Sequence, residues 1–433
     1  MIRGSVTIFA TRILQVGSGA LIAVLLARAL GIDGYGDYTL MLTLMLVVVI
    51  PVQFGISRLL VRDTKRLADE PEELMGFLRW AALLSVLWSL VGIGLIAVAA
   101  GALSQKDDRA LMALLPIAVA TMFAINASFF LSGVLAGKFR TELEQSVQNI
   151  LRPAIFLAFL AALNLALGSL TAGIAFAAYL ASVSVALVFL WRAVISEVNI
   201  LPPAPIAQER RAAWLKSASY FMMIGGVDVV LQSTDILMLG AMATSADVGI
   251  YRIGAILAAL LSLPLSAATT HAAPRIAAAA ADGAAFAAIQ NQSIRLAKLC
   301  CAATVVLLLG AWFFAQPVIA FAFGAGFEGS HLILLVLGAG SVFNVAMGLN
   351  RAFLSMRGQE AVVFRVMCVT AALNLVLNYL FISWSGTVGA AAATAISTMF
   401  WNVWLHVETH RRLGCGVAAF SSAMQSAPSA SQR

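Results

Sequence analysis

Long apolar segments recur along the whole chain and alternate with short polar ones. Each segment is long enough, as an α-helix, to cross a hydrocarbon layer of about 30 Å. Twelve such segments are predicted, at residues 6–30, 38–62, 77–100, 110–137, 150–167, 170–192, 216–241, 247–273, 296–322, 331–356, 362–383 and 386–406. Only Gly168 and Ser169 separate the fifth from the sixth. The pattern predicts an all-α polytopic membrane protein with twelve transmembrane helices.

The polar segments suggest how the helices are grouped. The loop between the sixth and seventh apolar segments contains Pro202, Pro203 and Pro205, and is typical of a linker. The predicted division is a six-helix bundle over 1–195, a cytoplasmic linker over 196–215, a second six-helix bundle over 216–410, and a Ser/Ala-rich disordered tail over 411–433.

A short internal repeat supports two similar halves. Gly36-Asp37-Tyr38 follows the first apolar segment, and Gly249-Ile250-Tyr251 lies at the start of the eighth, 213 residues further along. Two halves of the same orientation would be parallel repeats, related by an axis along the membrane normal.

Composition and charge agree with a membrane location. Hydrophobic residues make up 61% of the chain and charged residues 11%, far from the roughly 25% charged residues of soluble domains. With both termini in the cytoplasm, all 27 Lys and Arg residues except Arg28, Lys106, Arg109 and Arg252 fall on the cytoplasmic side. The net charge of +7 is scattered among short loops, which argues against nucleic-acid binding.

Three ionisable residues lie inside predicted spans: Arg12, Asp228 and Asp235. A charge near the bilayer centre costs roughly 2.5–3.5 kcal/mol on insertion scales, so such residues usually face a polar interior. Asp228, Gln232 and Asp235 share one face of the seventh segment. We expect these charges to line a cavity, with cation coupling or charge balance as the role of the two carboxylates. The alternative is an Asp–Arg pair that only locks the fold.

Other polar residues in the spans are candidate substrate ligands. Arginine side chains suit phosphate, because the planar guanidinium donates paired hydrogen bonds, but those near helix ends also reach the lipid headgroups readily. The amides could face sugar hydroxyls or join helices to one another. The candidate substrate-binding residues are Arg12, Arg28, Arg58, Arg252, Asn344, Arg351, Asn374 and Asn378.

Several catalytic and metal motifs are absent from the sequence. There is no G-x-x-x-x-G-K-[ST], H-E-x-x-H or G-x-S-x-G, and the four cysteines form no zinc spacing. We therefore expect no catalytic residues, no metal and no cofactor, apart from a coupling ion such as H⁺ or Na⁺. The longest predicted outer loop, Gly101 to Arg109, is too short for a typical catalytic domain of a polymerase or ligase.

Motifs along the chain resemble a known family. They are Leu30-Gly31-Ile32-Asp33-Gly34-Tyr35-Gly36-Asp37-Tyr38, Phe54-Gly55-Ile56-Ser57-Arg58-Leu59-Leu60-Val61-Arg62, Asp235-Ile236-Leu237-Met238-Leu239-Gly240, Val248-Gly249-Ile250-Tyr251, Leu354-Ser355-Met356-Arg357-Gly358 and Leu373-Asn374-Leu375-Val376-Leu377-Asn378. Their order and spacing resemble the polysaccharide biosynthesis or O-antigen (Wzx-type) flippases of the multidrug/oligosaccharidyl-lipid/polysaccharide exporter (MOP) superfamily.

The resemblance implies two six-helix bundles around a central cationic cavity, with Asp235 matching a family aspartate. It implies a flippase of the bacterial inner membrane that moves an undecaprenyl-pyrophosphate-linked oligosaccharide by alternating access. Glycan polymerases and glycosyltransferases would be candidate partners. A multidrug antiporter of the same superfamily is the main alternative, and a polymerase or ligase is a weaker one.

Overall fold

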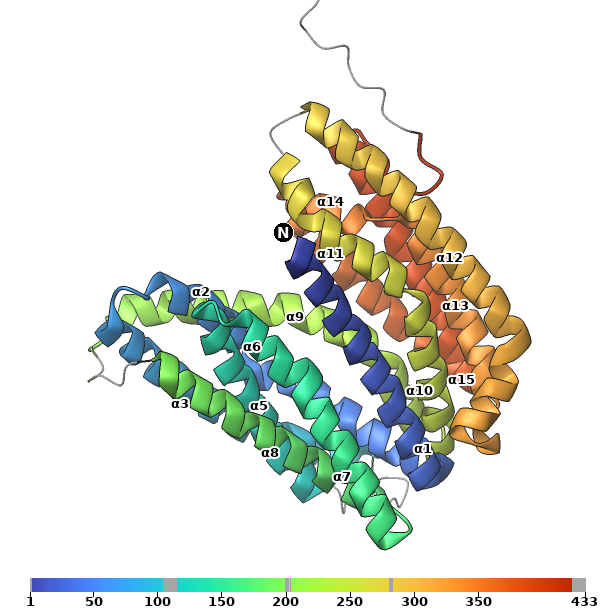
Figure 1. The fold of residues 1–433 in the computed structure, drawn as a ribbon, viewed down its shortest axis with the longest axis horizontal. Helices are drawn as coiled ribbons and strands as arrows, with labels where there is room; N and C mark the ends of the chain where they lie inside the picture. Colours follow the sequence, from blue (N-terminus) through green and yellow to red (C-terminus); the bar gives the residue numbers. More distant parts are fainter. Residues whose placement is uncertain (1, 104–114, 199–201, 203, 280–282, 423–433) are drawn as a thin grey trace, which may run out of the picture. The chain divides into compact units, whose positions relative to one another are not determined.

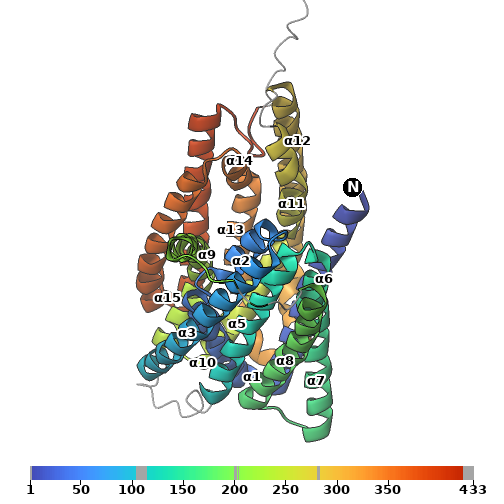
Figure 2. The same cartoon turned by 90° about the vertical axis from the view of Figure 1, so that its left-hand side faces the viewer.

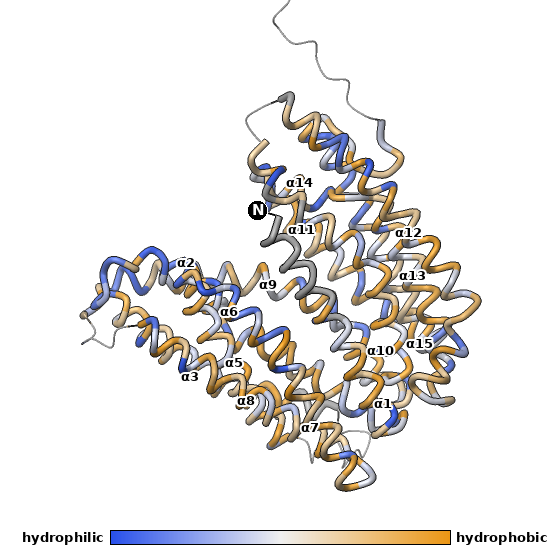
Figure 3. Tube along the Cα trace, viewed as in Figure 1, coloured by the Kyte–Doolittle hydropathy of each residue, from blue (hydrophilic) through white to orange (hydrophobic). Residues whose placement is uncertain are grey.

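The computed structural model describes residues 2–103, 115–198, 202, 204–279 and 283–422 (Figure 1). These residues form helices and no strand. Nine of the described helices are long and apolar enough to span a membrane, or ten if a bent pair, Ser245–Leu261 and Leu263–Thr269, counts as one span. Hydrophobic residues run along the helices, and hydrophilic ones gather around α2 and at helix ends (Figure 3). The all-α membrane fold is therefore confirmed, whereas the number twelve stays a prediction.

The described chain divides into two compact units, Val6–Gly249 and Ile250–Arg433, the latter with Met1–Ser5. The helices that lie wholly or mostly in the first unit are α1 (Ile2–Gln53), α2 (Ile56–Arg66), α3 (Pro71–Leu103), α5 (Leu115–Gly137), α6 (Thr141–Ser146), α7 (Arg152–Leu167), α8 (Ala172–Glu197) and α9 (Gln208–Met242). The boundary between the units falls within α10 (Ser245–Leu261). The helices of the second unit are α11 (Leu263–Ala278), α12 (Gly283–Phe323), α13 (Ser330–Met347), α14 (Asn350–Met356) and α15 (Glu360–Leu413). In the first unit α5 packs against α8, as both views show (Figures 1 and 2).

The two longest helices are each interrupted where the sequence predicts a boundary. In α1 the break is Gly31, with φ 71° and ψ −177°, directly after the predicted segment 6–30. In α15 it is Ser385 and Gly386, between the predicted segments 362–383 and 386–406. The second predicted segment, 38–62, is itself broken, because Phe54 and Gly55 have positive φ values and separate α1 from α2.

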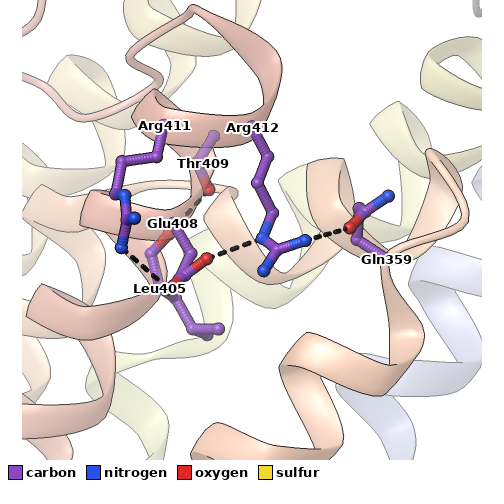
Figure 4. Close-up of polar contacts among 6 residues, drawn as sticks. All are labelled: Gln359, Leu405, Glu408, Thr409, Arg411 and Arg412. Carbon is purple, nitrogen blue, oxygen red and sulfur yellow. Dashed lines mark hydrogen bonds and ion pairs between the residues drawn. The ribbon is translucent and has the colours of Figure 1, made fainter.

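Hydrogen bonds show that α15 is a helical hairpin. The Nδ2 of Asn374 donates to the Oγ of Ser397 at 3.2 Å, although 23 residues of straight helix would span about 35 Å. At the ends of the two arms, Arg412 Nη1 donates to Gln359 Oε1 at 3.0 Å (Figure 4). Arg412 is also bonded to Glu408 within its own arm. The arms of α15 therefore run antiparallel.

The fifth and sixth predicted segments are also separate helices. Gly168 ends α7 in the left-handed conformation, with φ 72°. Thr171 then caps α8, since its side chain accepts from the Ile174 amide at 3.3 Å. Before α7, a π-helical turn at Val147–Leu151 joins it to α6.

The two compact units divide between Gly249 and Ile250, and the linker at 196–215 stays a prediction. The N-terminal half of α9 belongs to the first unit, where Trp214 and Ala218 lie in one hydrophobic core with Phe54, Leu59 and Phe77. Gly55 makes this packing close, because a methyl group there would lie 2.2 Å from the Ala218 carbonyl oxygen. Apolar contact therefore holds the N-terminal part of α9 against α2 and α3.

The prediction of disorder over 411–433 does not hold for residues 411–422. Helix α15 continues to Leu413, and the chain then folds back onto the second unit, where Cys415 and Val417 are buried. The amide of Ala419 donates to the Ala346 carbonyl at 2.7 Å, and burial raises the pKa of the Cys415 thiol to about 11. Apolar residues among the serines supply this packing. Residues 423–433 lie outside the described part of the chain.

The repeated glycines meet in a reciprocal contact in the first unit. A methyl group at Gly36 would lie 1.8 Å from the Ser245 carbonyl oxygen, and one at Gly249 would lie 2.8 Å from the Ile32 carbonyl oxygen. Ile32 and Ser245 are 213 residues apart, as are the two glycines. The Ser245 hydroxyl also donates to Asp37 Oδ1. Each glycine therefore meets the residue that corresponds, in the repeat, to the one its counterpart meets. Such a reciprocal contact is typical of two-fold symmetry, so the repeat corresponds to an approximate local symmetry.

This contact predicts that Gly36→Ala destabilises the protein. The added methyl group overlaps a backbone oxygen, which has little freedom to move, so we expect a loss of roughly 1–3 kcal/mol, as for overpacked cores. Thermal unfolding of purified protein in detergent measures the effect. Gly17→Ala is the matched control, because nothing lies within 4 Å of the methyl group added there. Equal midpoints for the two variants would contradict the contact.

Candidate functional site

The first unit contains five of the predicted site residues. Arg12 belongs to the first arm of α1, but its side chain lies outside the described part of the structure. Arg28 is exposed near the end of the same arm and has an interaction partner. The remaining three residues, Arg58, Asp228 and Asp235, lie on α2 and α9.

A polar stripe runs along α9 at helical spacing. It comprises Ser217, Gly225, Asp228 and Gln232, and Asp235 follows three residues later. Asp235 is buried, with 7% of its surface exposed, and its Oδ1 accepts from the Ile236 amide at 2.9 Å. Asp228 is half-buried, and both carboxylates have interaction partners. Burial makes a full negative charge costly unless a cation or a proton accompanies it.

Helix α2 is amphipathic and presents arginines to α9. Its apolar face, with Ile56, Leu59 and Leu60, is buried. On the other face Arg62 binds the buried carboxylate of Asp63, through Nη2 to Oδ2 at 2.7 Å, and donates to Ser217 Oγ at 3.3 Å. Arg62 also lies 5.7 Å from the centroid of the Phe221 ring. Arg62 is therefore a structural link between α2 and α9.

Arg58 lies one turn before Arg62 and differs from it. Its side chain is exposed and crosses α9 at Gly225, where an added methyl group would lie 3.6 to 3.8 Å from the guanidinium atoms. Among the described residues no carboxylate or hydrogen-bond acceptor pairs with it. A guanidinium with five donors and no protein acceptor is ready to bind an anion.

The predicted residues of the second unit fall into different environments. Arg252 is half-buried on α10 and has no hydrogen bond or ion pair to a described residue. Arg351 is exposed on α14, 5.8 Å from the centroid of the Trp401 ring. The side chain of Asn344, on α13, accepts from the Nδ2 of Asn402 at 3.0 Å.

Asn374 and Asn378 are held inside the α15 hairpin. They are 2% and 0% exposed, and Asn378 Nδ2 donates to the Oδ1 of Asn374 at 3.1 Å. Asn374 in turn donates to Ser397 on the other arm. Asn374 therefore joins the two arms, and Asn378 bonds to Asn374 within one arm. The role of both amides as sugar ligands stays a prediction.

The structure therefore brings Arg58 next to α9, whose stripe carries Asp228 and Asp235, and leaves the amides of α15 in a packed interface. Sequence reasoning missed Arg62, Asp63 and Gly225. The available signal was the spacing of Arg58 and Arg62, since residues four apart lie on the same face of a helix. Both follow Phe54-Gly55 in the sequence. No group of three or more potential metal-ligating side chains occurs among the described residues.

Comparison with known proteins places the chain in a family. The family described as "Polysaccharide biosynthesis protein" matches residues 1–279. The chain is similar to an inward-facing multidrug resistance MATE family transporter of the MOP superfamily, with a TM-score of 0.79 and 14% identity over 92% of this chain and 94% of that one. It is also similar to the lipid II flippase MurJ in an inward closed conformation, with a TM-score of 0.74 and 14% identity over 94% of this chain and 87% of that one.

A third similar structure is a MOP superfamily transporter from Pyrococcus furiosus, with a TM-score of 0.61 and 14% identity over 95% of each chain. A search of curated proteins finds no match. The fold is therefore that of the multi-pass membrane proteins of the MOP superfamily to which these structures belong. The chain belongs to the polysaccharide biosynthesis protein family.

The α15 hairpin generates a prediction that separates the two interpretations of its amides. Asn374→Ala removes the bonds to Ser397 and Asn378, so we expect a loss of stability of roughly 1–3 kcal/mol, as for buried unsatisfied polar groups. Transport per folded molecule should be unchanged. Ser383→Ala is the control, because that exposed hydroxyl bonds only to Tyr379 in its own arm. Full stability combined with weaker substrate binding would instead identify Asn374 as a ligand.

Proposed function

We propose that this protein is a flippase that moves an undecaprenyl-pyrophosphate-linked oligosaccharide across the bacterial inner membrane. The cargo would serve O-antigen or exopolysaccharide synthesis, and the movement would proceed by alternating access. The family membership and the likeness to the MurJ and MATE folds support a transporter of this superfamily. The distribution of basic residues supports cytoplasmic termini.

The observation that carries the proposal is Arg58, which pairs with no acceptor in the part of the chain that the structure describes. It lies near the end of α1 and α2 that the basic residues assign to the cytoplasmic side, where a lipid-linked cargo would be loaded. A pyrophosphate offers several anionic oxygens to a planar guanidinium, and charge-assisted hydrogen bonds are stronger than neutral ones. Arg252 in the second unit is a further candidate anion ligand, together with Arg12, Arg28 and Arg351.

An exposed arginine also argues against the alternative of a multidrug antiporter. Such an antiporter exports cationic compounds, which Arg58 would repel. An anionic headgroup is attracted by the same charge. We therefore favour a lipid-linked anionic cargo over a cationic drug.

Coupling to a cation is assigned to Asp228 and Asp235. Asp235 is buried in α9, the helix that Arg58 contacts at Gly225. A proton or Na⁺ bound by these carboxylates would change the charge of α9, and so the affinity of the neighbouring arginine for an anion. Release of cargo and uptake of the cation would then be linked.

The role of Arg58 predicts how substitutions at Arg58 and at Gly225 change the flipping rate. Arg58→Ala should lower flipping of lipid-linked oligosaccharide in proteoliposomes by roughly tenfold or more, as expected for a lost charge-assisted hydrogen bond. Gly225→Leu should act similarly, because its side chain occupies the position of the guanidinium. Gly225→Ala is the control, since its methyl group makes ordinary contacts from 3.6 Å. Flipping by Arg58→Ala at the wild-type rate would contradict the proposal.

The coupling role predicts that Asp235→Asn abolishes flipping driven by an ion gradient. The amide keeps the size of the side chain but cannot carry the charge change. The measurement is flipping with and without an imposed H⁺ or Na⁺ gradient, at equal amounts of folded protein. Ser233→Ala, a change at a buried position two residues away, is the control. A gradient response that survives in Asp235→Asn would exclude this carboxylate as the coupling group.

A further inference from the structure

A groove lies between α3 and α8 in the first unit, with α5 as its floor. Its volume is about 410 Å³, within the usual range of ligand pockets. The floor and walls carry small side chains at Ala82, Ser85 and Ala127, and aromatic ones at Phe123, Phe130 and Trp191. All three helices are candidate membrane spans, so the groove is at membrane depth.

The walls of the groove face hydrocarbon. Val86 on α3 is 56% exposed, and Val188 and Trp191 on α8 are 53% and 56% exposed. Neighbouring exposed residues are also large and apolar, such as Leu87 and Phe189. A contiguous exposed surface of this kind marks contact with lipid rather than with an aqueous cavity. The groove therefore opens sideways, toward the chains of membrane lipids.

The polar groups of the groove, Asn126 on α5 and Ser85 and Ser89 on α3, are bonded to one another. The Nδ2 of Asn126 donates to the Oγ of Ser85 and to the Oγ of Ser89, each at 2.8 Å. The Ser89 hydroxyl donates to the Ser85 carbonyl at 2.8 Å. These bonds use the amide hydrogens of Asn126 and the hydroxyl hydrogen of Ser89, and Ser85 Oγ accepts one of them. The other nine lining residues are hydrophobic. The occupant is therefore held by apolar contact and shape.

The volume of the groove favours a lipid with a single chain. Its volume holds about fourteen methylene-sized groups, if each is taken as close to a water molecule at about 30 Å³. That is one chain segment, of about three isoprene units. A phospholipid would have to leave its second chain on the ridge formed by α3 or α8. The branch methyl groups of an isoprenoid also fill the space left by small residues such as Ala82 and Ala127.

We propose that this groove binds the polyisoprenoid tail of the cargo while its headgroup is handled elsewhere in the protein. The inference rests on the proposed function and adds a binding site for the part of the cargo that carries no charge. It assigns to α3, α5 and α8 a role in holding the lipid, distinct from that of α2 and α9.

The test is photo-crosslinking of purified protein in phospholipid nanodiscs. The probe is a short polyprenyl phosphate with a diazirine in its chain, and the labelled peptides are identified by mass spectrometry. We expect labels on the groove segments of α3, α5 and α8, and competition by unlabelled polyprenyl phosphate but not by phosphatidylglycerol. Ala127→Trp, which fills the groove, should lower this labelling roughly tenfold. Leu87→Trp, at an exposed position outside the groove, is the control.

Two results would overturn the inference. One is labelling that ignores the competitor, which would mean ordinary contact with bulk lipid, and the other is equal competition by phosphatidylglycerol. Flipping of lipid-linked oligosaccharide by the same wild-type preparation separates this inference from the proposed function. If flipping occurs without specific labelling of the groove, the tail site is wrong and the flippase stands. If no flipping occurs, the proposed function itself fails.

Discussion

Polar groups inside a bilayer have to be satisfied by the protein itself, and this constraint organises the whole structure. It explains why the described residues are helical, since a helix bonds its own backbone. It also explains the side-chain pairs that recur at membrane depth. Asn126 is bonded to two serines of α3, and Asn374 joins the two arms of α15. Against that background Arg58, whose guanidinium has no described acceptor, stands out as a group suited to a ligand.

Close packing of backbone supplies a second set of constraints, and glycines mark them. Gly36 and Gly249 allow carbonyl oxygens to approach where any side chain would collide, and Gly55 does the same between α2 and α9. Small residues at helix contacts are expected in membranes, because dispersion and close approach replace the hydrophobic effect between helices. Here Gly55 also brings α2, which carries Arg58 and Arg62, close to α9, which carries Asp228 and Asp235.

Much of the fold could be predicted from the sequence, because the period and length of apolar segments reflect the bilayer directly. The boundaries at Gly31, Gly168 and Ser385-Gly386 lie where composition indicated them. The packing of Trp214 against Phe77 and Trp80 could not be predicted, since it joins segments far apart in sequence. The packing of residues 411–422 was missed for a similar reason: a Ser/Ala-rich composition hides the few apolar residues that dock.

The candidate site was predictable only in part. Arg58, Asp228 and Asp235 were identified from charges in or near apolar segments. Whether a charged side chain is paired depends on side-chain geometry. The difference between Arg58 and Arg62, which bonds to Asp63 and Ser217, is therefore visible only in the contacts. The amides of α15 could not be interpreted from the sequence, because an asparagine that binds a ligand and one that bonds to another helix have the same sequence pattern.

The segment after α15 has a consequence for how the protein is made. Ala419 bonds to the end of α13, next to the break that separates α13 from α14, and Val417 lies in the same core. A nascent chain emerging from the ribosome therefore inserts the spans of the second unit before it has the residues that seal them. Docking of this segment has to wait until translation has passed Ala419, whereas the contacts within the first unit are available much earlier.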